Sequence, residues 1–247
     1  MKFSILASGS SGNVCIVEEH TTKIMIDCGT SKQYFTNALE ELHESISSMD
    51  ALLLTHGHQD HVSRIKAMRE IESYGTFEIA KSGHHIIGTH DTFIVKDLKI
   101  TSIPLSHDYA KTVGYIIESA NEKLVYVTDT GYLNDRWKQE LANAQYYIFE
   151  SNHDPKMLMN SSRPYLTKQR ILSAEGHLSN EDSALALASL VGPQTMQLFL
   201  AHLSTEANDE TLALDTLYGL LESTRISTAD KRIQAARQFE ILHGGKR

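Results

Sequence analysis

The sequence predicts a mixed α/β protein built as a four-layer αββα sandwich, in which two mixed sheets pack face to face and helices cover both outer sides. The first observation is the order of elements along the 247 residues, which runs strands, helices, more strands and more helices. The second is that polar residues directly follow several strands, at the edge of a sandwich where side chains can converge. One domain over residues 1–247 is expected, because no linker interrupts the pattern.

The first part of the chain indicates an antiparallel meander followed by a helix. Strand patterns cover residues 2–7, 13–18, 23–26 and 51–54. A Gly/Ser turn at residues 8–13 joins the first two strands. Apolar side chains at helical spacing predict a helix over residues 31–44, with Ser31 as its N-cap, and a second helix is expected over residues 61–72.

Strands and helices alternate again in the rest of the chain. Strands are expected at residues 77–80, 92–95, 98–104, 112–118, 123–128, 145–150 and 195–201. Helices are expected at residues 180–191 and 209–221, the second with its apolar face formed by Leu212, Leu214, Leu217 and Leu221. Residues 154–173 predict a long, partly helical excursion, and the tail at residues 231–242 is expected to end in a strand.

The composition is that of a globular protein without a membrane span. Hydrophobic residues make up 41% and charged residues 22% of the chain, and no apolar run approaches the roughly 20 residues that a membrane helix needs. The apolar run in residues 1–13 is too short for a signal peptide, so a cytoplasmic location is expected. Cys15 and Cys28 lie in strand-like patterns, which favours small buried residues over a disulfide.

The formal net charge of −8 by itself argues against a nucleic acid partner. Two divalent ions at an acidic site would return about four positive charges, however. Local clusters of basic residues are therefore a better guide to a nucleic acid partner than the net charge of the chain. Candidate phosphate contacts gather in three clusters: Lys156, Arg163, Lys168 and Arg170; Arg64, Lys66 and Arg69; and Lys231, Arg232, Arg237, Lys246 and Arg247. The alternative for each of them is a solvated helix face.

A dense group of possible metal ligands follows the buried strand at residues 51–54. The segment THGHQDH contains His56, His58, Asp60 and His61. Because the loop is irregular, the first two of these side chains can point one way and the last two another, which suits two neighbouring ions better than one. Imidazole and carboxylate ligands favour Zn or Mn, with Fe as a further candidate, over Ca or Mg. The alternative is a polar loop that happens to be rich in histidine.

THGHQDH resembles the signature of the metallo-β-lactamase fold, an αββα sandwich, and the likeness covers essentially the whole chain. Further ligands are expected at strand ends, although a lone histidine there is usually a surface or capping residue. The resemblance implies two divalent ions, one bound by His56, His58 and His107, the other by Asp60, His61 and His202, with Asp129 as the bridge. Asp27 is implied to be an acid behind the metal loop that accepts an N–H from it.

A second resemblance concerns the substrate. GHLS at residues 176–179 and AHLSTE at residues 201–206 resemble the closing part of RNase J-like and RNase Z-like nucleases. By that match His177 would contact the scissile phosphate, whereas its alternative role is that of a neighbour to the helix N-cap Ser179. Only residues 130–176 separate Asp129 from His177, too few for the β-CASP insertion of RNase J-like enzymes.

The chain is most similar to the compact bacterial YycJ/WalJ (VicX) group of exonucleases, through the segments ASGSSGN, ESNHD, GHLSN and AHLST. The likeness implies a DNA exonuclease that acts from the 5′ end, with a role in repair and with RNA as the alternative polymer. A hydroxide would attack the phosphorus, Asp60 would orient it or accept its proton, and His177 would stabilise or protonate the leaving group. Weaker candidates for substrate contact are Ser10, Asn13 and His153.

Two other functions compete with this hypothesis. The first is a small-molecule hydrolase of the same fold that acts on a cyclic phosphodiester or a thioester. Salt dependence and competition by DNA would distinguish it from a nuclease. The second is a non-catalytic regulatory or scaffold protein with a vestigial site, and the complete set of ligand residues argues against it.

Overall fold

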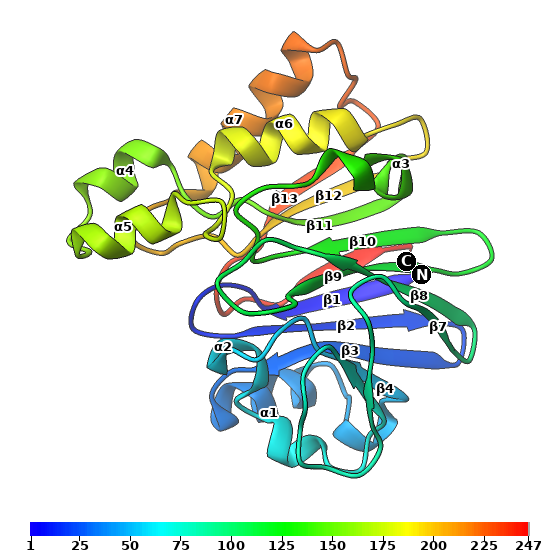
Figure 1. Cartoon of the computed structure of the whole chain (residues 1–247). Coiled ribbons are helices and arrows are strands. Elements are labelled where there is room, and N and C mark those ends of the chain that lie inside the picture. Colours follow the sequence, from blue (N-terminus) through cyan, green and yellow to red (C-terminus); the bar gives the residue numbers. More distant parts are fainter. Residues whose placement is uncertain (247) are drawn as a thin grey trace.

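Two seven-stranded sheets face each other and helices lie on both outer sides, as the computed structural model shows (Figure 1). The structure describes residues 1–246, so Arg247, one of the expected phosphate contacts, lies outside the described residues. The order of layers is helices, sheet, sheet, helices. It confirms the mixed α/β sandwich that the sequence predicts.

The first sheet begins as the predicted antiparallel meander and continues with parallel strands. Its strand order is β14-β1-β2-β3-β4-β5-β6. The strands in chain order are β1 (Lys2–Ala7), β2 (Asn13–Glu19), β3 (Thr22–Gly29), β4 (Ala51–Leu53), β5 (Ser73–Gly75), β6 (His84–Ile86) and β14 (Leu242–Gly245). β14 pairs antiparallel with β1, so the end of the chain returns to the sheet in which it starts.

In the second sheet, the strands that come first in the chain pair antiparallel and the later ones pair parallel. Its strand order is β13-β12-β11-β10-β9-β8-β7. The strands in chain order are β7 (Thr92–Val95), β8 (Leu98–Pro104), β9 (Val113–Glu118), β10 (Lys123–Val127), β11 (Tyr146–Glu150), β12 (Gln197–Ala201) and β13 (Arg232–Ala235). The parallel run from β10 to β13 is connected by helices, as parallel strands require.

Each sheet has its own helical cover. The elements on the first sheet are α1 (Lys32–Glu41), η1 (Ile46–Ser48), α2 (Gln59–Val62) and η2 (Ile65–Met68). Those on the second are η3 (Asp135–Trp137), α3 (Lys138–Leu141), α6 (Asn180–Leu190) and α7 (Glu210–Ser223). α4 (Pro155–Asn160) and α5 (Tyr165–Ile171) form the predicted excursion and project beyond the sheets at the end where α2 lies (Figure 1).

The main core fills the space between the sheets. Phe3 on β1 makes edge-to-face contacts with Tyr146 and Phe199 of the opposite sheet, at ring-centroid distances of 5.5 and 5.2 Å. Separate apolar clusters join each sheet to its helices. Because most strands bury both of their faces, their side chains are apolar in continuous runs rather than in alternation.

The helix expected over residues 61–72 is wrong in length. α2 ends at Val62, and the Arg64 N–H donates to the carbonyl of Cys28 at 2.9 Å instead of continuing the helix. Residues 77–80 do not form the expected strand, because β6 takes the place beside β5. Along α7 the buried face includes Ala213 rather than Leu212, which is 37% exposed.

Other features of the composition can be compared with the structure. Cys15 and Cys28 are free and buried, which confirms that they are not a disulfide pair. Burial raises the pKa of both thiols, so they stay protonated and unreactive at neutral pH. Within residues 1–246, no helix has the length and apolar character that crossing a bilayer requires.

Tyr115 on β9 connects the two sheets through a fully buried hydrogen bond. Its hydroxyl donates to the Leu54 carbonyl at 2.6 Å. Tyr115→Phe removes this donor from the core, so we expect the free energy of unfolding of the metal-free protein to fall by about 1–3 kcal/mol, measured by urea titration. Tyr218→Phe on the surface of α7 is the control and should change it by less than about 0.5 kcal/mol. Equal stability of the two variants would contradict the prediction.

Candidate metal centre

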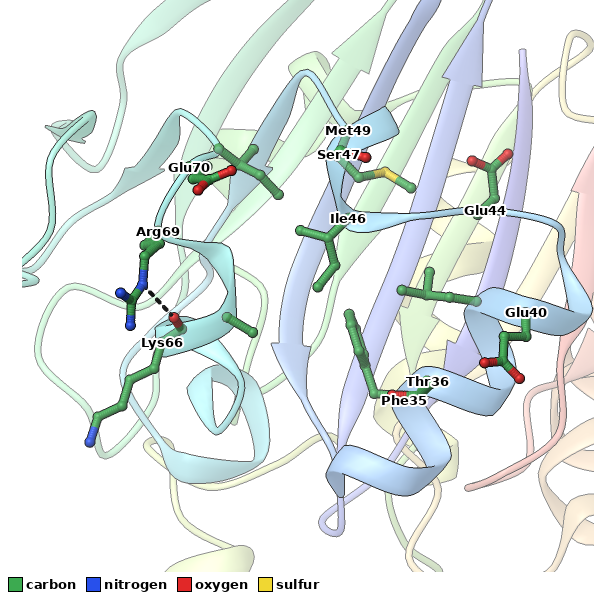
Figure 2. A pocket seen from close by; sticks show the side chains of 13 residues that line it. Phe35, Thr36, Glu40, Glu44, Ile46, Ser47, Met49, Lys66, Arg69 and Glu70 are labelled. Atoms are coloured by element: carbon green, nitrogen blue, oxygen red, sulfur yellow. Dashed lines mark hydrogen bonds between the residues drawn. The ribbon is translucent and has the colours of Figure 1, made fainter.

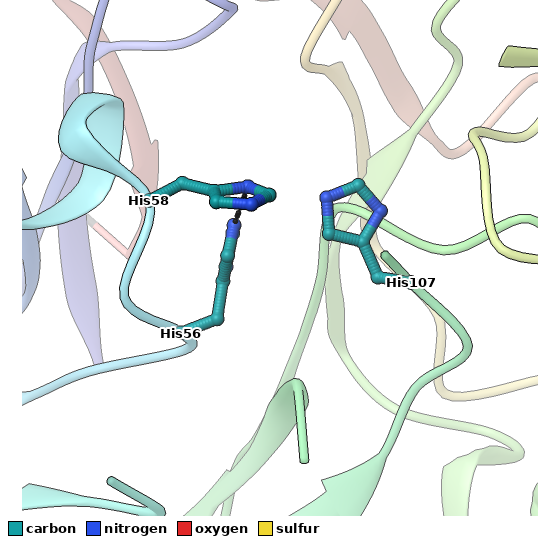
Figure 3. A group of neighbouring side chains, drawn as sticks. All are labelled: His56, His58 and His107. Atoms are coloured by element: carbon teal, nitrogen blue, oxygen red, sulfur yellow. Dashed lines mark hydrogen bonds between the residues drawn. The ribbon is translucent and has the colours of Figure 1, made fainter. Parts of the chain in front are cut away.

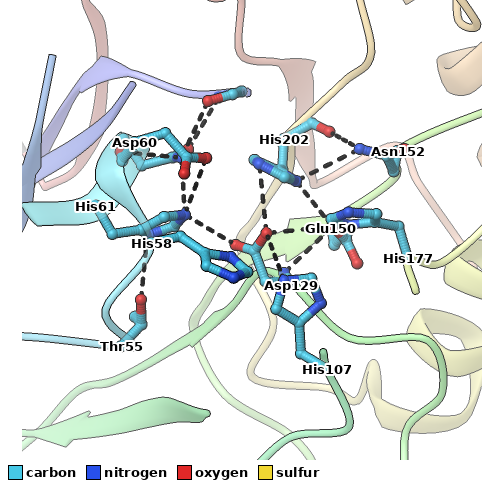
Figure 4. A network of polar contacts seen from close by, with 12 residues as sticks. Thr55, His58, Asp60, His61, His107, Asp129, Glu150, Asn152, His177 and His202 are labelled. Atoms are coloured by element: carbon cyan, nitrogen blue, oxygen red, sulfur yellow. Dashed lines mark hydrogen bonds and ion pairs between the residues drawn. The ribbon is translucent and has the colours of Figure 1, made fainter. Parts of the chain in front are cut away.

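Histidine and carboxylate side chains from both sheets meet at one edge of the sandwich (Figure 4). They lie at or just beyond the ends of strands, where the chain turns sharply. Asp27, Asp129 and His202 each have a positive φ, of 56°, 62° and 57°, which is uncommon for residues other than glycine. Such backbone strain is concentrated at functional sites because the surrounding structure must hold it in place.

The first group of possible ligands is formed by three histidines (Figure 3). His56, His58 and His107 offer nitrogen atoms that all lie within 4.8 Å of one another. Burial, together with the neighbouring imidazoles, lowers the pKa of His56, so its ring is neutral and one of its nitrogens carries a lone pair that can bind a cation. His107 Nδ1 lies 3.1 Å from the Gly176 carbonyl and must donate to it, which leaves Nε2 as the ligand atom.

The second group consists of Asp60, His61 and His202, whose ligand atoms also lie within 4.8 Å of one another. His61 Nε2 is 3.4 Å from a carboxylate oxygen of Asp60. Burial alone would lower the pKa of His202, but Asp129 and Glu150 raise it to about 9. In the absence of an ion, a proton therefore supplies the positive charge that these carboxylates require.

Asp129 lies between the two groups. One of its carboxylate oxygens is 3.4 Å from His61 Nε2, and the other is 3.4 Å from His202 Nε2 and 3.9 Å from His107 Nε2. Asp129 Oδ2 and His202 Nε2 are buried, and neither has a hydrogen-bond partner among residues 1–246. Buried polar atoms without partners are costly unless a ligand satisfies them. These atoms and the imidazole-rich donor set fit two divalent cations.

Asp27 lies behind the metal loop and holds it in place. Its carboxylate accepts from the backbone N–H and the hydroxyl of Thr55, each at 2.9 Å. The same carboxylate is 2.7 Å from His61 Nδ1, so His61 presents Nε2 to the group. This is the contact that the resemblance implies for Asp27, and burial raises the pKa of its carboxyl.

Glu150, at the end of β11, is the central residue that the sequence analysis misses. Its fully buried carboxylate lies 2.9 Å from Nδ1 of both His177 and His202. It also accepts from the backbone N–H groups of Asp129, Thr130 and Leu178 at 3.0–3.2 Å. Burial by itself raises the pKa of Glu150, but the two histidines lower it well below its usual value, so the group is ionised.

A sequence signal for Glu150 does exist. The residue is the last of a buried strand, close to the strand-end placement of His107, Asp129 and His202, and it opens the segment ESNHD. A carboxylate in that position cannot be recognised as a hydrogen-bond acceptor until the partner strand is known. The structure provides the partner, because β12 runs beside β11 and His202 directly follows it.

His177 lies beside both groups. Its ring centroid is 5.0 Å from that of His107 and 5.2 Å from that of His202. Its Nδ1 is bonded to Glu150 and lies 3.8 Å from Asp129, so Nε2 is the ring nitrogen available to a substrate, and the side chain is 12% exposed. A tight turn at Gly176 places His177 beside the two groups. A Cβ at Gly176 would collide with the backbone of Ile171.

The weaker candidates for substrate contact have different surroundings. Asn13 is buried, and its amide lies 3.0 Å from His61 Nε2 and bonds both backbone groups of Gly9. Ser10 is exposed, and most N–H groups of its turn are bonded within the chain. His153 is buried, and neither of its ring nitrogens has a hydrogen-bond partner in the described part of the chain.

A cavity of about 780 Å³ lies elsewhere, on the outer side of the first sheet (Figure 2). Its apolar floor includes Phe35, Leu39 and Ile46, and charged side chains such as Lys66 and Glu40 surround its opening. None of the candidate metal ligands lines it. The metal-ligand chemistry of the protein is therefore separate from this cavity.

Comparison with known sequences identifies relatives over nearly the whole chain. A sequence model described as the beta-lactamase superfamily domain matches residues 22–202. The exodeoxyribonuclease YycJ of Bacillus anthracis is 34% identical over 236 residues, which cover 90% of this chain and 89% of that protein. The exodeoxyribonuclease WalJ of Streptococcus pneumoniae is 36% identical over 238 residues, which cover 89% of this chain and 88% of that protein.

Solved structures of low sequence identity share the fold. The metallo-beta-lactamase fold protein YhfI of Bacillus subtilis has a TM-score of 0.72 at 15% identity, covering 98% of this chain and 99% of that chain. The short form of human tRNase Z has a TM-score of 0.66 at 13% identity and covers 98% of both chains. These likenesses confirm the predicted fold.

Glu150→Gln tests whether this carboxylate holds the candidate ligands. A glutamine amide would direct its own N–H groups toward donors that now point at Glu150, so His202 would lose its orientation. We expect the affinity for Zn or Mn to fall by roughly 10- to 100-fold, as measured by competition with a chromogenic chelator. The control is Glu222→Gln on the exposed side of α7. Unchanged affinity in Glu150→Gln would contradict the prediction.

Proposed function

Because the chain belongs to the beta-lactamase superfamily and, within it, to the family of the YycJ and WalJ exodeoxyribonucleases, we propose that it is a metal-dependent exonuclease that hydrolyses DNA from the 5′ end. The observation that supports this most directly is the placement of His177. A partly accessible imidazole, fixed by a buried carboxylate, lies beside two groups of metal ligands. A phosphodiesterase needs these components close together.

The candidate ligands divide between two ions. His56, His58 and His107 would hold one, Asp60, His61 and His202 would hold the other, and Asp129 would contact both. When bound, Zn or Mn ions would offset the negative charge of the phosphate and make water a better nucleophile. We infer that residues 1–247 form one catalytic domain without a β-CASP insertion and that a DNA substrate places it in the cytoplasm.

Asp60 is suited to orient the attacking water. Its side chain is 24% exposed, whereas that of His61 beside it is fully buried. The Asn13 amide lies 3.5 Å from the Asp60 carboxylate and limits its movement. The carboxylate can therefore accept a hydrogen bond from a water molecule that enters the site from solvent.

His177 is suited to act on the leaving oxygen. The bond from its Nδ1 to Glu150 fixes the orientation of the ring. Its Nε2 can then donate a proton to the oxygen that leaves the phosphorus. The same carboxylate holds His202, so the proton donor and a predicted metal ligand are kept in a constant relative position.

The proposed activity can be tested on protein that is stripped with a chelator and reloaded separately with Mn and Zn. Single- and double-stranded DNA labelled at either end, RNA, and bis(p-nitrophenyl) phosphate serve as substrates. We expect metal-dependent shortening of DNA that releases the 5′ label first. Turnover of the small diester without cleavage of any polymer would instead indicate a small-molecule phosphodiesterase, and shortening of RNA alone would overturn the preference for DNA.

Substitutions in the two kinds of site residue should separate metal binding from chemistry. His58→Ala should lose metal and activity together, because it removes a ligand of the three-histidine group. His177→Ala should keep its metal and lose roughly 10²- to 10⁴-fold in turnover of DNA, the usual contribution of a general acid. Metal content and initial rates measure both effects, and His90→Ala on the surface is the control. Full activity of a metal-replete His177→Ala variant would exclude the proposed role.

A further inference from the structure

We propose that the exposed face of α5, from Tyr165 and Leu166 to Arg170, receives a single strand of nucleic acid and guides it to the candidate metal centre. The inference rests on the proposed function, because it concerns how the same site takes its polymer substrate. α4 and α5 project from the end of the sandwich where α2 and the metal loop lie (Figure 1). A chain that leaves the site in their direction would run along α5.

The excursion has a charge pattern opposite to that of the whole protein. Residues 155–174 contain Lys156, Arg163, Lys168 and Arg170 but neither aspartate nor glutamate, in a chain with a formal net charge of −8. A polyanion approaching the protein would be repelled by most of its surface and attracted to this segment. The charge of the excursion is therefore complementary to a nucleic acid backbone.

Two of these four candidate phosphate contacts have bonds within the protein instead. The Lys168 ammonium donates to the carbonyls of Met159 and Ser161 at 2.7 and 2.8 Å and so completes the end of α4. The Arg163 guanidinium is paired with Glu206 at 3.2 Å. These bonds hold both side chains against their own protein neighbours, so direct contact with phosphate is expected first from Lys156 and Arg170.

Arg170 is connected to the candidate metal centre through Asp108. Its guanidinium bonds one carboxylate oxygen of Asp108, and the other oxygen lies 3.1 Å from His107 Nε2 and 3.6 Å from His58 Nε2. The Arg170 side chain is 49% exposed, so its remaining N–H groups are available to a ligand. A phosphate next to the scissile one would come within reach of it.

Exposed apolar and aromatic side chains lie at the start of α5, where Leu166, four residues before Arg170, shares its side of the helix. Tyr165 is 63% and Leu166 is 78% exposed, at the start of the helix that carries Arg170 near its end. Gln169 bonds the Tyr165 hydroxyl at 3.0 Å, so the ring is fixed along the helix. Exposed rings and apolar side chains can stack on the faces of unpaired bases, and a neighbouring cation can bind the phosphate backbone. A duplex does not expose the faces of its bases in this way.

The test is the affinity for a fluorescein-labelled single-stranded oligonucleotide, measured by anisotropy on metal-loaded protein in a His177→Ala background that slows cleavage. Tyr165→Ala should weaken binding by roughly 5- to 100-fold, the usual effect of losing one stacking contact, and Tyr165→Phe should retain it. Tyr218→Ala on the exposed surface of α7 is the control. A duplex of the same sequence should bind less tightly than the single strand.

Arg170→Gln separates phosphate binding from a role through Asp108. Loss of one phosphate contact should make the slope of log affinity against log salt less steep by about 0.7 for a single strand. Asp108→Asn releases the guanidinium and should bind the oligonucleotide at least as tightly as the parent. An equal loss of affinity in Asp108→Asn and Arg170→Gln would show that the pair is structural and would overturn the role of Arg170.

The remaining outcomes distinguish this inference from the proposed function. If the parent binds the oligonucleotide and Tyr165→Ala binds it equally well, the face of α5 is not the path of the strand, while the nuclease function stands. If the protein with His177 intact turns over bis(p-nitrophenyl) phosphate but neither binds nor cleaves any nucleic acid, both this inference and the proposed function are overturned. Tighter binding of the duplex than of the single strand would also overturn the inference.

Discussion

The candidate site depends on a single physical constraint, which is that a carboxylate removed from water must be surrounded by donors. Asp27 in the first sheet and Glu150 in the second are both fully buried. The donors around them are the side chains and backbone N–H groups that form the site, including His61 on one side and His177 and His202 on the other. Each sheet thus positions its own set of functional groups around one buried acid.

The sandwich is what brings these two sets together. The metal loop follows β4 of the first sheet, whereas Asp129 and His202 follow β10 and β12 of the second. The two halves meet closely, since Tyr115 of the second sheet bonds the Leu54 carbonyl just before the loop. At Gly29 a Cβ would collide with the backbone of Asp60, so packing of this density also fixes the metal loop against β3. Fold and site geometry therefore cannot be separated.

The sequence predicts most of this site because much of its information is local. THGHQDH places its candidate ligands within one loop, and the residues after β8, β10 and β12 follow from recognising strand ends. Glu150 escapes this reasoning because its partners lie far away in the sequence and are defined only by strand pairing. The helix expected over residues 61–72 is wrong for the same reason, since the bond from Arg64 to Cys28 of β3 ends it early.

The basic residues of the excursion show most clearly what cannot be predicted from the sequence alone. Counting residues identifies a basic excursion in an acidic protein, but it treats Lys168 and Arg170 as equivalent. The structure separates them, because the first satisfies carbonyl groups of its own excursion and the second lies against a carboxylate that contacts two predicted metal ligands. A cation acts on a substrate only through donors that the fold leaves free. The proposed binding of a polyanion therefore depends on a few positions near the site rather than on the net charge of the chain.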